Sequence, residues 1–371
     1  MKYNWTELKP QIRQVWQLSL PAILTQITTI IMQYIDSAMV GALGANASAS
    51  IGLVIPCTWL FGGVTYAVAV GFSVQVAHRI GAEQDAQARN VVRHGLVAAF
   101  LISSLLSLLG ILLSKPLPIW LGGDPAILQD ATLYFLAFSL MVPFSQLNSL
   151  SSSCLQCTGD MLTPSILNAI MCFLDVIFNW IFIPQYGVLG AGIGTALACL
   201  VVSLIMAWRC CISNPRLSLL QKDKCSFELN TLKKAFRIGS PVALQEIAMN
   251  AAMVAAVAII TPLGSIAVAA NAFAVTAESL CYMPGYGLGY AATTLVGRSI
   301  GAGDIKLAKR YDNICTDSMA ITKPPEVSAA SRRLTLSVLV HTMITGSAVG
   351  SASGSPSNLS RSPRTNPSYS P

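Results

Sequence analysis

The chain has 371 residues, of which 53% are hydrophobic and only 11% are charged, and its mean hydropathy is +0.60. Soluble globular proteins carry roughly 25% charged residues. The composition therefore excludes a soluble domain and predicts an integral membrane protein surrounded by the lipid bilayer. The net charge of +7 does not indicate a nucleic-acid partner, because the basic residues cluster at the ends of apolar segments.

Apolar segments follow one another from residue 14 to residue 297. A helix that crosses the bilayer needs about 20 mainly apolar residues, and turn signals such as PQYG at 184–187 divide the longer runs. The sequence predicts an all-α polytopic membrane protein with eight transmembrane helices. Their approximate positions are residues 14–42, 49–77, 94–114, 130–155, 162–184, 188–209, 236–261 and 266–297.

Lysine and arginine are unequally distributed between the two ends of these spans. With the N-terminus placed in the cytoplasm, the inner segments up to residue 310 hold 17 of them and the outer segments hold Lys115 alone. Cytoplasmic loops of membrane proteins carry such an excess. We therefore expect a multi-pass protein of the cell's inner (plasma) membrane with a cytoplasmic N-terminus.

The sequence repeats itself at an offset of 220 residues. Residues 21–90 align with residues 241–310 without a gap and share 15 identical positions. Equivalent positions in the two copies are six predicted spans apart. Because six is an even number, both copies have the same orientation in the membrane, and parallel repeats of this kind are typical of transporters. The expected domains are one complete six-helix lobe at 1–212, a basic cytoplasmic linker at 213–235, and the first two helices of a parallel second lobe at 236–314.

Residues 315–371 resemble no earlier part of the chain. Residues 316–371 contain 13 Ser and 6 Pro, a composition typical of disordered segments. The change near Cys315 is abrupt and ends a six-helix lobe after two helices. We therefore expect a disordered tail, and a shifted reading frame is one explanation for it.

No pattern in the sequence indicates an enzyme or a cofactor. A phosphate-binding G-x-x-x-x-G-K-[ST] loop is absent. The ten cysteines are scattered, and several lie in apolar runs, where a free thiol behaves as a small hydrophobe. Cys154 and Cys157 form a C-x-x-C pair, but no second pair or nearby histidine accompanies it, so we interpret the pair as structural.

Four carboxylates lie inside predicted spans: Asp36, Asp175, Glu246 and Glu278. An ionised side chain at mid-membrane costs about 2.5–3.5 kcal/mol on insertion scales. These groups must therefore face an interior cavity, be protonated, or hold a cation. Because burial favours the neutral acid and a bound cation favours the ionised one, such a group can act as a proton or cation switch.

The fifth span carries a polar face. Asn168, Asp175 and Asn179 fall within about 40° of one another at 100° per residue, and Thr195 on the next span adds a hydroxyl. Amide, hydroxyl and carboxylate oxygens suit a proton site or Na⁺, so Asp36, Asp175 and Asn179 are the candidate ligands if the ion is Na⁺. The alternative is that the amides and the hydroxyl only join helices by hydrogen bonds.

The acids of the two repeat copies differ, because Asp36 aligns with Ala256 and Glu246 aligns with Gln26. We interpret Glu246 and Glu278 as a second acidic surface that faces a cationic substrate. Aromatic and methionine side chains near it could stack on such a cation, although most aromatic residues in spans only pack. These candidates are Met32, Tyr34, Tyr282 and Met283.

Several stretches resemble the multidrug and toxic compound extrusion (MATE) transporters. They are IDSAMVGALG at 35–44, LDVIFNWIFIPQYGVLGAGIGTALA at 174–198 and AESLCYMPGYGLGYAATTLVGRSIGAGD at 277–304. The resemblance covers residues 10 to about 312. It implies antiport, in which an organic cation leaves while H⁺ or Na⁺ enters, with Asp36, Asp175, Asn179 and Thr195 as the coupling site. The sequence departs from the family in having Asp before Asn in the fifth span, and eight spans in place of twelve.

Three functions are consistent with the sequence. The first is a monomeric secondary antiporter that exports cationic drugs or toxic organic compounds in exchange for H⁺ or Na⁺ and is impaired by the truncation. The second is a lipid-linked precursor flippase of the same superfamily, but the mid-membrane Lys or Arg residues that would hold a pyrophosphate are missing from the predicted spans. The third is an inactive or assembly-only membrane fragment.

Overall fold

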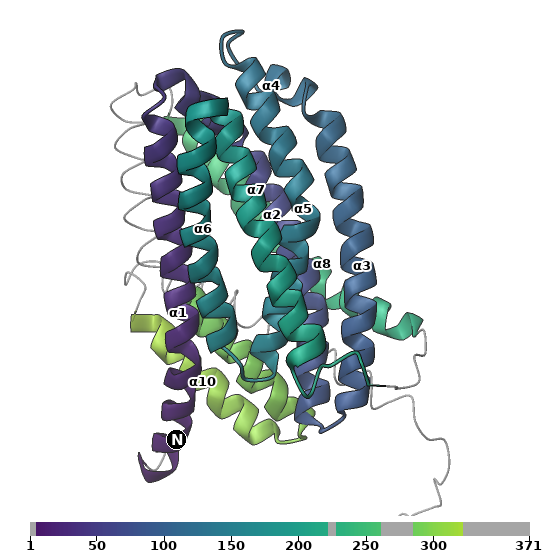
Figure 1. Ribbon diagram of the computed structural model, residues 1–371. Helices are drawn as coiled ribbons and strands as arrows, with labels where there is room; N and C mark the ends of the chain where they lie inside the picture. Colours follow the sequence, from purple (N-terminus) through teal and green to yellow (C-terminus); the bar gives the residue numbers. More distant parts are fainter. Residues whose placement is uncertain (1–4, 222–227, 261–284, 322–371) are drawn as a thin grey trace, which may run out of the picture.

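The computed structural model describes residues 5–221, 228–260 and 285–321, and within these ranges every regular element is a helix (Figure 1). Residues 285–301 are also helical. The helices in chain order are α1 (Trp5–Gly41), α2 (Ala45–Gly81), α3 (Asp85–Leu113), α4 (Pro116–Trp120), α5 (Leu128–Cys157), α6 (Leu162–Tyr186), α7 (Val188–Trp208), the π-helical turn η1 (Arg209–Ser213), α8 (Leu229–Ile260) and α10 (Ile305–Ile321).

Six helices of the described ranges are long and apolar enough to cross a membrane, namely α1, α2, α3, α5, α6 and α7. They match the first six predicted spans. The seventh predicted span lies in α8, which begins at Leu229, so the end of the predicted linker is helical. Of the eighth span only the part from residue 285 is described, so the total of eight stays a prediction.

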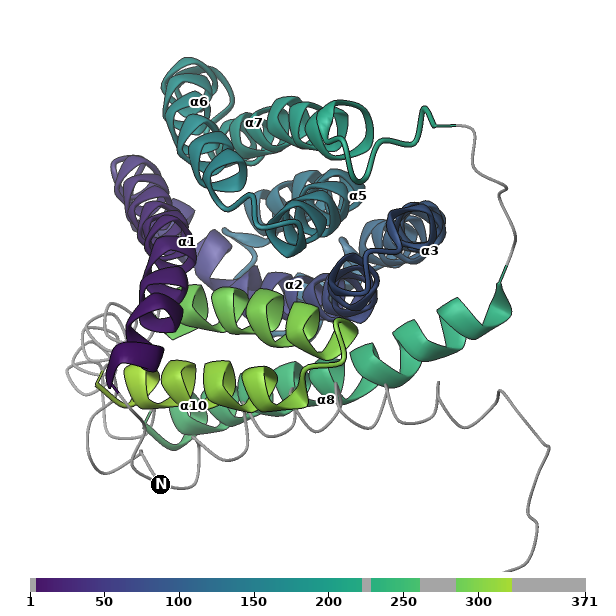
Figure 2. The same cartoon turned by 90° about the horizontal axis from the view of Figure 1, so that it is seen from below.

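The C-terminal helices form a separate layer. Seen from below, α8, residues 285–301 and α10 lie on one side of α1 and α2, while α5, α6 and α7 lie on the other (Figure 2). α10 continues to Ile321, past the predicted start of the tail at 315. The rest of the predicted tail, residues 322–371, lies outside the described residues.

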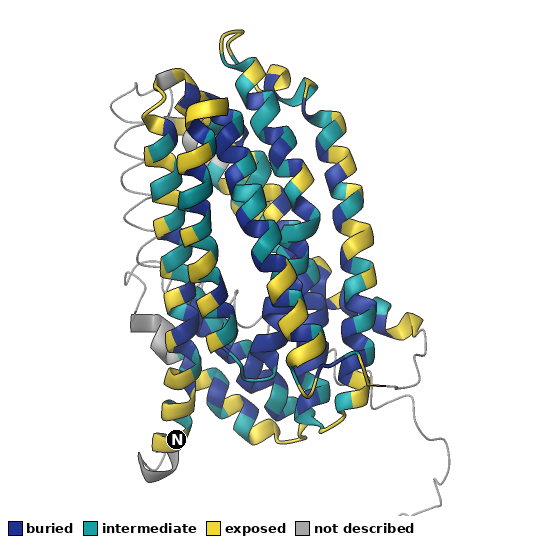
Figure 3. Ribbon diagram, viewed as in Figure 1, coloured by how far each residue is buried: buried dark blue, intermediate teal, exposed yellow. Residues whose placement is uncertain are grey.

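Large apolar side chains cover the outer faces of the helices. Figure 3 shows exposed positions along α1, α3 and α6, and Leu105, Phe173 and Trp180 are 67%, 67% and 75% exposed. In water such a surface would be unfavourable, but in a bilayer acyl chains cover it. The pattern agrees with a multi-pass membrane protein.

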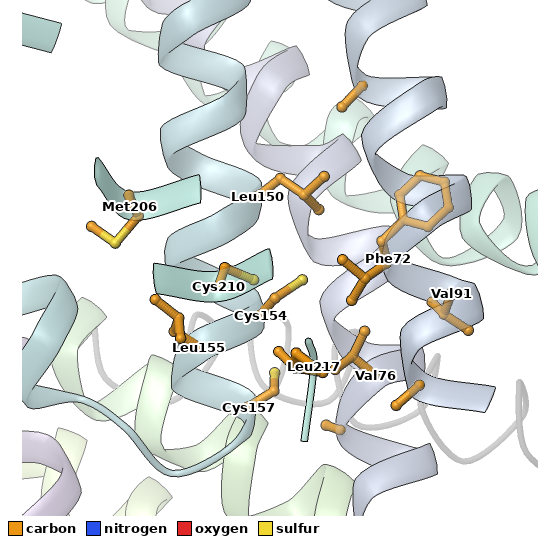
Figure 4. Close-up of a cluster of buried hydrophobic side chains, with 14 of the residues drawn as sticks. Phe72, Val76, Val91, Leu150, Cys154, Leu155, Cys157, Met206, Cys210 and Leu217 are labelled. Carbon is orange, nitrogen blue, oxygen red and sulfur yellow. The ribbon is translucent and has the colours of Figure 1, made fainter. Parts of the chain in front are cut away.

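Two of the apolar clusters inside the first six helices involve both α2 and α5. One joins α2, α3, α5 and α7 around Phe72, Leu150 and Met206 (Figure 4). The other joins α2 and α5 through Phe61 and Phe135, whose rings meet edge to face at 5.9 Å. The C-x-x-C cysteines belong to the first cluster, where Cys157 Sγ donates to the carbonyl oxygen of Ser73 at 3.2 Å. All eight described cysteines are free.

Both copies of the repeat end their second helix in the same turn. In the first copy, the backbone nitrogens of Glu83 and Gln84 donate to the carbonyl oxygens of Ile80 and Arg79. Residues 303 and 304 donate to residues 300 and 299 in the same way. Glu83 and Gly303 both have positive φ, 59° and 79°, a conformation that favours glycine. The shared turn supports the repeat found in the sequence.

The two copies also contact each other reciprocally. A Cβ added at Gly81 would lie 2.0 Å from the carbonyl oxygen of Arg298, and one added at Gly301 would lie 2.0 Å from that of His78. At the offset of 220, His78 is equivalent to Arg298 and Gly81 to Gly301. A pair of contacts that exchanges equivalent residues is the mark of a two-fold axis. The glycines are therefore required where α2 and the helix at 285–301 cross.

The start of the linker is held against α3. Arg89 donates to the carbonyl oxygen of Arg216, and Arg93 donates to those of Leu219 and Gln221, each at 3.2 Å. The backbone nitrogen of Glu228 donates to His94 Nε2 at 3.1 Å. The described ends of the linker are thus bound to the first six helices by hydrogen bonds to backbone groups.

Arg93→Ala is expected to release the linker without unfolding the helices. The hydrogen bonds from the Arg93 side chain to two linker carbonyl oxygens are lost, which lowers the local stability of the linker. Tryptic cleavage after Arg216 and Lys222 should therefore accelerate by about threefold. Limited proteolysis with mass spectrometry measures the rate, with Arg13→Ala on α1 as the control. Unchanged cleavage in Arg93→Ala would mean that these hydrogen bonds do not hold the segment.

Candidate functional site

One amide connects two acids across the contact between α1 and α6. Asn179 Nδ2 donates to Asp36 Oδ1 at 2.9 Å and to Asp175 Oδ2 at 3.2 Å. Asp175 and Asn179 are fully buried, and Asp36 is partly buried. Three of the five predicted coupling residues are therefore joined directly by hydrogen bonds.

The pattern of α6 explains why these polar groups face inward. Asp175 and Asn179 are four residues apart and so share one face of the helix. Phe173 and Trp180, on other faces, are 67% and 75% exposed. Turning the apolar faces toward lipid places the carboxylate and the amide against α1, where Asp36 is the partner.

The pair of acids has unused oxygen acceptors. Asp175 Oδ1 and Asn179 Oδ1 are buried and have no hydrogen-bond partner among the described residues. Buried polar atoms are rarely left unpaired, because each such atom costs about 1–3 kcal/mol. Two neighbouring carboxylates also repel each other when both are ionised. A proton shared between them, or a small cation bound to the free oxygens, would relieve both effects.

Two further side chains lie near the acids, and one predicted residue does not. The Thr195 hydroxyl donates to the carbonyl oxygen of Ala191 at 3.1 Å and neighbours Asp175. Tyr134 on α5 lies close to both acids, and the apolar sequence around it gave no signal of this. Asn168 lies on the same face of α6 but seven residues before Asp175. At about 1.5 Å per residue the separation along the helix axis is roughly 10 Å.

A second cluster surrounds Glu246 on α8. Its Cβ lies 2.9 Å from the position that a Cβ on Gly63 of α2 would take. Glu246 also lies near Tyr66 and Tyr290, whose rings meet edge to face at 6.4 Å, and Tyr286 is a further neighbour of Tyr66. These tyrosines were not among the predicted site residues, although the identity of Tyr66 and Tyr286 in the repeat was a usable signal.

The other predicted substrate-binding residues contribute less. Tyr34 is 42% exposed and lies two residues before Asp36 on α1. Glu278, Tyr282 and Met283 lie outside the described residues. Across residues 5–221, 228–260 and 285–321, no group of three or more His, Cys, Asp or Glu side chains is arranged to hold a metal. Any Na⁺ at the acid pair would therefore need the Asn179 and Thr195 oxygens as well.

Sequence comparison matches the chain to one family model and to curated proteins. The MatE family model matches residues 21–181 and 241–322. The chain is 26% identical over 309 residues to the probable multidrug resistance protein NorM of Thermotoga maritima, covering 80% of this chain and 65% of that protein. It is 23% identical over 308 residues to an FAD transporter of Shewanella oneidensis, covering 80% and 67%. The chain thus spans about two thirds of the length of these curated relatives.

Solved structures share the fold. A transporter of the MOP superfamily from Pyrococcus furiosus superposes with a TM-score of 0.80 at 20% identity, over 90% of this chain and 77% of that one. A Vibrio cholerae MATE transporter in its bent form gives a TM-score of 0.78 at 21% identity, over 85% and 72%.

Proposed function

The chain belongs to the MatE family, and from this premise we propose that it forms the larger part of a secondary antiporter. It exports cationic drugs or other toxic organic compounds from the cytoplasm in exchange for H⁺ or Na⁺. It acts as a monomer in the inner membrane, with its N-terminus in the cytoplasm. The contact of Asp36, Asn179 and Asp175 between α1 and α6 is the observation that carries the proposal.

The coupling step follows from the chemistry of that contact. When the two acids hold a proton or Na⁺, the charge of the pair is reduced, and α1 and α6 can remain together in a low-dielectric interior. When the ion leaves, repulsion between two ionised carboxylates favours separation of the helices or entry of water. An ion that binds one arrangement better than the other shifts the equilibrium between them. Thr195 and Asn179 supply the additional oxygens for Na⁺.

The second lobe supplies the substrate surface in this proposal. In this proposal the two copies of the repeat are related by a two-fold axis along the membrane normal, and Glu246 with its neighbouring tyrosines would face the substrate where the two copies meet. A carboxylate beside aromatic rings suits an organic cation, since both the charge and the ring faces attract it. Glu278, Tyr34 and Met283 are further proposed substrate contacts.

The cationic substrate class rests on charge. One relative is named as an FAD transporter, and FAD carries an anionic pyrophosphate, which an acidic surface would repel. The spans of this chain hold no Lys or Arg at mid-membrane, so neither FAD nor a pyrophosphate-linked lipid would find a basic partner there. The acidic composition of both clusters therefore favours a cation.

Transport by the 371-residue chain is expected to be weak. The matched part of this chain covers about two thirds of these relatives, and alternating access needs both lobes. Export of a fluorescent organic cation from cells lacking their own exporters tests this. We expect background export from the chain itself and strong export from a version completed to twelve spans. Measurable export by the 371-residue chain would refute the impairment.

The same export assay distinguishes H⁺ from Na⁺ as the coupling ion and tests the substrate class. Collapsing the proton gradient or the sodium gradient in turn identifies the coupling ion, because export stops only when the coupled gradient is lost. A completed chain that moves FAD and no cation would overturn the substrate class. A completed chain that moves neither would favour the inactive or assembly-only alternative.

A further inference from the structure

Helix α7 approaches the side chain of Asn179 at Gly194. A Cβ added at Gly194 would lie 2.2 Å from Asn179 Oδ1, 3.1 Å from its Cγ and 3.0 Å from its backbone nitrogen. Real Cβ atoms essentially never lie within 3.0 Å of a non-bonded heavy atom. Any side chain at position 194 would therefore occupy the space that the amide of Asn179 now fills.

The other close-packed glycines of α7 have different neighbours. A Cβ at Gly190 would meet the carbonyl oxygen of Phe182 at 2.2 Å, and one at Gly192 would meet the Cβ of Ala137 at 2.8 Å. These two contacts concern the packing of α7 on α6 and on α5. Gly194 differs from them because its neighbour is the side chain that joins the two acids.

The orientation of Asn179 depends on this space. Its Nδ2 donates to Asp36 and Asp175, while its Oδ1 has no hydrogen-bond partner in the part of the chain that the structure describes. The amide group is planar, so an obstacle at Oδ1 rotates the whole group and moves Nδ2 away from the carboxylates. Since no donor holds Oδ1, the free volume at Gly194 is what permits the observed orientation.

We propose that Gly194 is a positioning residue of the ion site, which sets the Asn179 amide so that one nitrogen donates to both Asp36 and Asp175. The proposal rests on the proposed function only for the role of this site in binding the coupled ion. Its test does not depend on transport, because the state of Asp36 can be measured directly in the 371-residue chain.

The test is the reaction of Asp36 with dicyclohexylcarbodiimide. This apolar reagent adds to a protonated carboxylic acid in an apolar site, and the adduct rearranges to a stable N-acylurea with no group leaving. Hydrogen bonds donated to a carboxylate favour its ionised form, so loss of the Asn179 bond should leave more Asp36 protonated. At pH 8 we expect Gly194→Ala to label Asp36 about three to ten times faster than the unmodified chain, as measured by mass spectrometry of the purified protein.

A double-mutant cycle distinguishes positioning from general damage. Asn179→Ala should raise the labelling rate to a similar extent, and adding Gly194→Ala to it should change little, because the displaced group is already gone. Gly192→Ala, which crowds the same helix away from Asn179, should label at the rate of the unmodified chain. If Gly194→Ala alone does not yield monodisperse protein, the double variant should, since it relieves the crowding.

Three results would overturn the proposal: unchanged labelling in Gly194→Ala, an equal increase in Gly192→Ala, or additive effects in the cycle. Dye export bears on the proposed function alone. A completed chain that exports nothing, while Gly194→Ala still accelerates labelling, would refute the transport role and support the positioning role.

Discussion

Asp36→Asn is expected to abolish cation export by the chain completed to twelve spans. Asparagine keeps the size of the side chain and can still accept a hydrogen bond from Asn179 Nδ2, which now contacts Asp36 Oδ1 at 2.9 Å. It cannot release or bind a proton, and it offers no charge to Na⁺. The contact between α1 and α6 would therefore persist while the site could no longer change its charge.

The measurement is efflux of a fluorescent organic cation from energised cells, with protein levels matched by immunoblot. Asp124→Asn serves as the control, because Asp124 lies in the turn before α5, where its carboxylate accepts a hydrogen bond from the backbone nitrogen of Ala126. Export that survives in Asp36→Asn would remove Asp36 from the coupling mechanism. Loss of export in both variants would point to a general defect instead.

Gly301→Ala is expected to destabilise the fold strongly. The added Cβ would lie 2.0 Å from the carbonyl oxygen of His78, and a backbone atom cannot move aside as a side chain can. Overpacking of this kind costs about 3 kcal/mol, so we expect the melting temperature of the detergent-purified chain to fall by about 5–10 °C. The equivalent Gly81→Ala should behave in the same way, because it meets Arg298 across the same crossing.

The control is Gly62→Ala on α2, where a Cβ would have no neighbour within 4 Å. Alanine is favoured over glycine in a helix by up to about 1 kcal/mol, so this variant should melt at the same or a slightly higher temperature. Size-exclusion chromatography of heated samples measures the loss of monodisperse protein and gives the midpoint temperature of melting. Equal melting of Gly301→Ala and Gly62→Ala would mean that the two repeat copies do not pack through these glycines.

The candidate site was only partly visible in the sequence. Asp36, Asp175 and Asn179 could be selected because a charged or amide side chain is costly in an apolar span, and a four-residue spacing places two of them on one face. Asn168 fits the same angular criterion but lies two turns from the acids, since helical angle says nothing about distance along the axis. Tyr134 carried no signal, because an aromatic residue in an apolar span most often only packs.

The sequence by itself determined the all-helical membrane class, the first six spans and the repeat, because these follow from local composition, from spacing along the chain and from identity between its two copies. It also identified the acids, since their cost in lipid does not depend on their partners. The tertiary structure alone decided which helices meet, and therefore that one amide joins Asp36 to Asp175 and that Gly194 leaves room for it. Such contacts join residues that are distant in the chain, and they depend on how the helices pack, which no local pattern encodes.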